Sequence, residues 1–156
     1  MKENPAEQII RDRLEPGQLS VEGFLGNDKR PIADIIAADT GVVEAAELTV
    51  KQLGEFLEKL HVTADGGWEG RVPMYDGKIS VRSDETLGQI PCPFACGTSC
   101  HKAVITVKNA DGENLLIFTP LAAHLISTHG FFEGKGSPCR IEPKELIKLF
   151  HHCTGE

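Results

Sequence analysis

Four residues with metal-binding side chains are spaced along the second part of this chain, and they constrain its fold more than any other feature. Cys92 and Cys96 have three residues between them, and His124 and His129 follow with four residues between them. Zn²⁺ prefers thiolate sulfur and imidazole nitrogen in a tetrahedron, and histidines three to five positions apart at a helix end can reach one ion. The spacing therefore predicts that these four residues hold one structural zinc ion.

The cysteines do not indicate a disulfide framework. All five follow residue 91, three of them lie within nine residues, and an odd number cannot pair completely within one chain. The N-terminal segment MKENPAEQII carries charges and a proline where a secretory signal needs an apolar stretch of about 7–15 residues. We therefore expect a cytoplasmic protein with reduced thiols, whose cysteines bind metal or are inert.

Composition and charge divide the chain at position 91. The hydrophobic share of 40% is usual for a globular protein, and runs such as Leu115 to Phe118 are far short of the about 20 residues that cross a bilayer, so no membrane partner is expected. Residues 1–91 hold 10 Lys and Arg against 17 Asp and Glu, whereas residues 92–156 hold 6 against 6. We therefore predict an acidic helical region 1–91 that ends in a β-hairpin, and a zinc-binding region 92–156.

The pattern of apolar, capping and turn residues predicts an α+β fold. The predicted helices cover residues 5–14, 31–39, 49–60, 120–129 and 143–152. The predicted β-hairpins pair segment 70–75 with 78–82, and segment 103–108 with 114–118. Trp68, which lies between turn residues, is expected to anchor the first hairpin. The expected order is a helical N-terminal part with a β-hairpin, then a zinc-binding ββα unit and a C-terminal helix.

With two cysteines, a β-hairpin and a helix that carries two histidines, the segment from Cys92 to His129 resembles the C2H2 zinc-finger arrangement. It differs in length, because 27 residues separate Cys96 from His124 where a finger has about 12, which implies a longer hairpin. The resemblance implies four protein ligands and no open coordination position, so the metal would contribute folding free energy. The rest of the chain resembles no specific family, and we expect a bacterial protein.

Other choices of ligand stay open at this point. Cys96 and Cys100 have the same spacing as Cys92 and Cys96, so Cys100 or His101 could replace one of the first two ligands. The thiols could also be inert buried groups that are unrelated to the histidines. An iron–sulfur cluster fits less well, because a matched fourth cysteine is missing at short range.

Two further motifs give weaker signals. The C-terminal segment 151–153, His-His-Cys, could form a second metal group with Cys139, but such residues are more typical of a helix end. The glycine-rich loop 130–137 lacks the four-residue spacer of a Walker A motif, and it leaves only a weak anion site at Lys135 and Arg140 as an option.

The function that best fits these patterns is that of a protein-recognition or scaffold module with a structural zinc. Nucleic-acid binding is the alternative, but the formal net charge is −7 and helix 120–129 contains no Lys or Arg to contact phosphates. A zinc enzyme ranks third, because it needs a water in place of one ligand and has Glu133 as its only local carboxylate. The sequence leaves the partner and the oligomeric state open.

Overall fold

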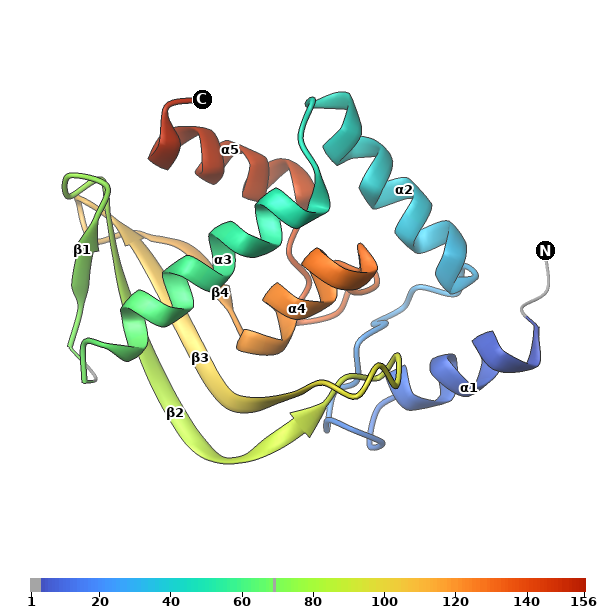
Figure 1. Ribbon diagram of the computed structural model, residues 1–156. Coiled ribbons are helices and arrows are strands. Elements are labelled where there is room, and N and C mark those ends of the chain that lie inside the picture. Colours follow the sequence, from blue (N-terminus) through green and yellow to red (C-terminus); the bar gives the residue numbers. More distant parts are fainter. Residues whose placement is uncertain (1–3, 69) are drawn as a thin grey trace.

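The computed structural model describes residues 4–68 and 70–156 and shows an α+β protein built on a four-stranded antiparallel sheet (Figure 1). The strands lie in sequence order, β1-β2-β3-β4. Their bounds are β1 Val72–Met74, β2 Ile79–Pro91, β3 Ser99–Asn109 and β4 Asn114–Phe118. The helices are α1 Pro5–Leu14, α2 Ile32–Ala45, α3 Val50–Asp65, α4 Pro120–His129 and α5 Pro143–Thr154. The predicted α+β class is therefore confirmed.

Helices α1 and α4 have the predicted bounds, and capping residues mark their ends. Helix α1 starts at the Asn4 capping box, in which the Asn4 side chain accepts a hydrogen bond from the backbone N–H of Glu7 at 2.8 Å. Helices α2, α3 and α5 are longer than predicted. Helix α2 continues through Gly41 to Ala45, because burial of Val43 outweighs the weak helix propensity of one glycine.

The central β2–β3 hairpin was not predicted, and its strands are much longer than the predicted segments 78–82 and 103–108. Strands β2 and β3 pair from Ile79↔Asn109 to Pro91↔Ser99, with a shift of register between Glu85 and Gln89. Beyond Glu85 the side chains of β2 are mostly exposed, so no apolar alternation marks this half of the strand. The curved hairpin carries the loop 92–98 at its tip, away from the rest of the sheet (Figure 1).

Two buried clusters hold the elements together. The larger lies between the sheet and helices α3, α4 and α5, and the smaller joins α1, α2, α4 and the cysteine loop around Leu14, Cys92 and Leu125. Helices α3 and α4 pack against each other and contact β2 and β3 respectively. Since β2 and β3 come from either side of position 91, the two regions of different charge share one sheet, and their division into domains stays a prediction.

The expectation that Trp68 anchors the first hairpin is wrong, because its side chain is 91% exposed. Among the helices of the described residues, none combines the length and the hydropathy that a membrane span requires.

Candidate metal centre

The structure brings the side chains of Cys92, Cys96, His124 and His129 together, with all four ligand atoms within 4.8 Å of one another. Cys92 Sγ lies 3.4 Å from His129 Nε2, and Cys96 Sγ lies 3.2 Å from His124 Nε2. In a tetrahedral zinc site with bonds of about 2.3 Å to sulfur and about 2.0 Å to nitrogen, the sulfur and nitrogen atoms are about 3.5 Å apart. The group therefore has the donors and the spacing to hold a metal ion. We call it the Cys₂His₂ group.

The two cysteines lie in the tight loop 92–98 that joins β2 to β3. The backbone N–H of Cys92 donates to the carbonyl of Thr98 at 2.8 Å, and Ala95 and Gly97 have left-handed φ values of 58° and 89°. This geometry turns the backbone N–H groups of Phe94 and Cys96 toward Cys92 Sγ. Backbone donors of this kind orient a thiolate and stabilise its negative charge.

The two histidines converge because α4 ends at the second of them, where the chain turns into the following loop. His129 is the last helical residue, and Gly130 closes the helix with φ 64° and a hydrogen bond from its N–H to the carbonyl of Ile126 at 3.0 Å. The two imidazole rings are 5.3 Å apart at 82°, and Phe94 stacks on His129 with ring centroids 4.3 Å apart. The predicted end of this helix at residue 129 is confirmed.

The two thiols differ in their protonation. Burial raises the pKa of Cys92 to about 11, whereas hydrogen bonds from Thr98, followed by His129, lower the pKa of the exposed Cys96 to about 5. In the metal-free protein, Cys96 is therefore a thiolate at neutral pH and Cys92 is a thiol. A metal ion would have to displace the proton of Cys92, since only the thiolate is a ligand.

The other residues that were considered as ligands, Cys100 and His101, lie outside the Cys₂His₂ group. Cys100 is half-buried outside the Cys₂His₂ group, and burial raises its pKa. Cys153 is buried in the larger core and Cys139 is exposed, so within residues 4–68 and 70–156 neither belongs to a metal-binding group. His101 faces His61 instead, with 3.3 Å between their Nε2 atoms.

In the loop after α4, Arg140 is not available for the weak anion site that the sequence left as an option. The Arg140 guanidinium donates to both carboxylate oxygens of Asp39, at 2.8 and 2.9 Å, and its side chain is only 5% exposed. Arg140 also donates to Glu142 at 2.8 Å. A buried arginine with two carboxylate partners has no free donor face for an anion.

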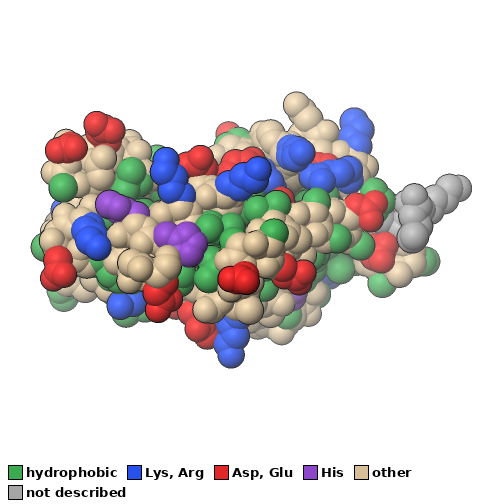
Figure 2. Space-filling view, turned by 90° about the horizontal axis from the view of Figure 1, so that it is seen from above, with side chains coloured by type: hydrophobic (Ala, Val, Ile, Leu, Met, Phe, Trp, Pro, Cys, Tyr) green, Lys and Arg blue, Asp and Glu red, His purple; other side chains and the backbone are tan. Residues whose placement is uncertain are grey.

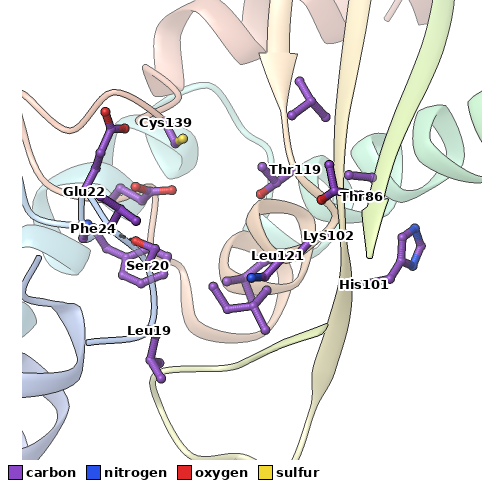
Figure 3. Close-up of a pocket in the computed structure, with 16 residues that line it drawn as sticks. Leu19, Ser20, Glu22, Phe24, Thr86, His101, Lys102, Thr119, Leu121 and Cys139 are labelled. Atoms are coloured by element: carbon purple, nitrogen blue, oxygen red, sulfur yellow. Dashed lines mark hydrogen bonds between the residues drawn. The ribbon is translucent and has the colours of Figure 1, made fainter. Parts of the chain in front are cut away.

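Glu133 lies at a different cavity from the Cys₂His₂ group. This cavity of about 450 Å³ has Phe24 and Cys139 on one side and Leu121 on the other (Figure 3). The Glu133 carboxylate accepts a hydrogen bond from Ser137 at 2.7 Å, and burial raises its pKa to about 7. No ligand of the Cys₂His₂ group is among the described residues that line this cavity, so Glu133 is not placed to act on a metal-bound water there.

No protein-family model, curated protein or solved structure matches this chain. The resemblance to the C2H2 arrangement therefore depends on the four donors alone.

A second group of donors was missed by the sequence analysis. The structure places ligand atoms of His61, Asp65 and His101 within 4.8 Å of one another. The only local signal is the spacing of His61 and Asp65, one turn apart on α3. His101 joins them from β3, and a residue pattern does not show which strand packs on which helix.

Proposed function

We propose that the Cys₂His₂ group binds Zn²⁺ as a structural site. The observation that carries this proposal is the convergence of two thiolate-type and two imidazole donors at zinc-like spacing. Neutral imidazole and thiolate favour zinc over magnesium or calcium, which prefer oxygen ligands. With four protein ligands the coordination sphere is full, and the ion then adds stability instead of activating water.

The position of the group supports a structural role. The ion would tie the loop 92–98, at the tip of the long β2–β3 hairpin, to the end of α4. In small zinc fingers such binding contributes about 10–16 kcal/mol at neutral pH, which is more than the whole stability of many domains. The tip of the hairpin would then depend on the metal for its position.

We further propose that the protein serves as a recognition or scaffold module for another protein. The outer face of the sheet exposes three apolar side chains, Val104, Leu115 and Ile117, which are 40–54% accessible. Exposed apolar side chains grouped on one face favour contact with a protein. Figure 2 shows Lys and Arg scattered among Asp and Glu on the face that it draws, without the basic stripe that is typical of nucleic-acid binding.

Replacement of single ligands tests the zinc proposal. Cys92→Ser and His124→Ala should each lose zinc from the purified protein and lower the melting temperature by more than about 10 °C. Cys139→Ser is the matched control, because it removes an exposed thiol outside the group and should change neither property. A Cys92→Ser protein that lacks metal but keeps the full melting temperature would contradict the structural role.

A binding assay separates the protein-recognition proposal from its nucleic-acid alternative. Fluorescence anisotropy with labelled duplex and single-stranded DNA and RNA at low salt should show no saturable binding, since phosphate contacts need clustered cations. Saturable binding that weakens with added salt would favour nucleic acid instead.

A further inference from the structure

The second group, His61, Asp65 and His101, has the donor set of an open metal site. His61 and Asp65 lie on one face of α3, at positions one helical turn apart. His101 lies on β3, next to the point where the β2–β3 register resumes at Gln89↔His101. Because α3 packs against the sheet, the helix and the strand present these side chains to the same point.

The distances match those around a tetrahedral ion. His61 Nε2 lies 3.3 Å from His101 Nε2, and Asp65 Oδ2 lies 2.9 Å from the first and 3.7 Å from the second. Bonds of about 2.0–2.1 Å to nitrogen and oxygen place the donors of such an ion about 3.3 Å apart. A metal ion at the centre would therefore bind all three atoms with small side-chain adjustments.

The surroundings favour a cation. The side chain of His61 is 8% exposed, and its Nδ1 atom has no hydrogen-bond partner but lies 3.6 Å from the Glu58 carboxylate. A carboxylate beyond the ligating imidazole orients the ring and makes it a better donor in many metal sites. Glu85 lies 3.7 Å from His101 Nε2, so acidic groups lie beside both imidazoles.

The group also opens onto free space. A cavity of about 440 Å³ is lined by both histidines and by His124 of the Cys₂His₂ group. A second cavity, of about 380 Å³, is lined by Asp65, Glu85 and Trp68. Three protein donors leave at least one position of a metal ion for water or an anionic ligand from either cavity.

We propose that His61, Asp65 and His101 form a second binding site for a divalent transition metal, with an open coordination position. Imidazole and carboxylate donors suit Zn²⁺, Fe²⁺ or Co²⁺, and the absence of a thiolate separates this site chemically from the Cys₂His₂ group. We call it the His₂Asp site. It does not depend on the first group being a zinc site.

Titration with Co²⁺ tests the proposal, with Trp68 as the reporter. Trp68 is the only tryptophan in the chain and shares a cavity with Asp65, and bound Co²⁺ quenches nearby indole fluorescence. The full-length protein is first given one equivalent of Zn²⁺ to fill the thiolate group and is then titrated with Co²⁺. Quenching should saturate at about one further equivalent of Co²⁺ per chain.

Variants identify the ligands. Asp65→Asn, which nearly preserves shape, should weaken Co²⁺ binding by more than about 10-fold, and His101→Ala should abolish the saturable phase. His152→Ala is the control, because this exposed histidine on α5 lies outside both groups. Quenching that never saturates, or that is unchanged in both Asp65→Asn and His101→Ala, would overturn the second site.

The absorption spectrum keeps the two proposals distinguishable. If the Cys₂His₂ group were not a metal site, Co²⁺ added to metal-free protein would give no thiolate-to-cobalt charge-transfer band, while Trp68 quenching would persist. If only the His₂Asp site were wrong, the charge-transfer band would appear and Trp68 would report no saturable binding.

Discussion

The Cys₂His₂ group and the His₂Asp site border one cavity, which is lined by His124 of the first and by both histidines of the second, yet they are built differently. The first takes two donors from a tight loop and two from the end of α4. The second takes all its donors from regular elements, two from α3 and one from β3. Helices and strands hold side chains in place without a metal, whereas a short loop does so less well. The first group should therefore depend on its ion for order, and the second should be formed before the ion arrives.

The two groups also differ in the charge and number of their donor atoms. Two thiolates cancel the charge of a divalent ion and, with two imidazoles, complete its coordination. Two imidazoles and one carboxylate leave a net positive, unsaturated ion that can bind a further ligand. One group is thus suited to stability and the other to exchange.

Chelation should give the largest difference between the groups. Removal of all metal should destabilise the protein by several kcal/mol through the Cys₂His₂ group, because structural zinc contributes folding free energy directly. The His101→Ala variant, which lacks only the His₂Asp site, should keep the stability of the wild type to within about 1 kcal/mol. Thermal denaturation with and without a chelator measures both. Equal destabilisation by chelation and by His101→Ala would contradict the prediction that only the Cys₂His₂ group depends on its metal for stability.

The pH dependence of stability should contain an opposing contribution from Glu133, which belongs to neither group. Its pKa rises from 4.5 to about 7 in the folded protein because the carboxyl group is buried. The native state then holds a proton that the unfolded chain has lost, so the contribution of Glu133 to stability is highest below pH 4.5 and falls as the pH rises to 7. The loss is about 3 kcal/mol, and metal ligation acts in the opposite direction because low pH protonates thiolates and imidazoles.

Denaturant unfolding of Glu133→Gln across this pH range isolates the effect. In the metal-free state, the unfolding free energy of the wild type relative to the variant should fall between pH 4.5 and 7, because other groups, such as Cys96 with its pKa lowered to about 5, contribute equally to both proteins. A difference between the two proteins that stays flat or rises over this interval would mean that Glu133 is ionised in the folded protein.

Thiol reactivity should separate the two cysteines of the first group. In metal-free protein at pH 7, iodoacetamide should modify Cys96 at least about 10-fold faster than Cys92, since only the thiolate reacts and Cys92 is buried. One equivalent of Zn²⁺ should protect Cys96. Mass spectrometry of the digested protein measures the alkylation rates of Cys92 and Cys96. The exposed Cys139 serves as the internal reference. Protection of Cys139 by zinc would point to a different ligand set.

The smallest expected effect comes from the ring that supports His129. Phe94 stacks on this imidazole, with 12° between the ring planes, and also contacts Phe131. Phe94→Ala should weaken zinc binding by about fivefold, equivalent to about 1 kcal/mol for a lost stacked pair. Competition with a chromogenic chelator measures this change. An unchanged affinity would show that the stacked ring of Phe94 does not help to position His129.

The sequence predicted the first group because its information is local. The three-residue gap of the cysteines and the end of α4 at Gly130 are both visible in the residue pattern. The second group was missed because His101 meets His61 only through the packing of α3 on a long hairpin. The exposed half of β2 carries no alternation, so the predicted strand segment ended at residue 82 and its pairing with β3 was not predicted.

The long-range partners of charged side chains could not be predicted from the sequence either. Arg140 follows a glycine-rich loop and was considered for an anion, but Asp39 of α2, about a hundred residues earlier, binds it in the folded chain. Capping boxes at Asn4 and Thr49 were predictable because each is completed within four residues. Local hydrogen bonds can be read from a sequence, whereas long-range ion pairs need the fold.

X-ray absorption at the zinc edge, on full-length protein loaded with one equivalent of Zn²⁺, identifies the atoms that bind the ion. We expect a first shell with two sulfur atoms at about 2.3 Å and two imidazole nitrogens at about 2.0 Å. A first shell of nitrogen and oxygen alone would contradict this expectation, because the ion would then lie outside the Cys₂His₂ group.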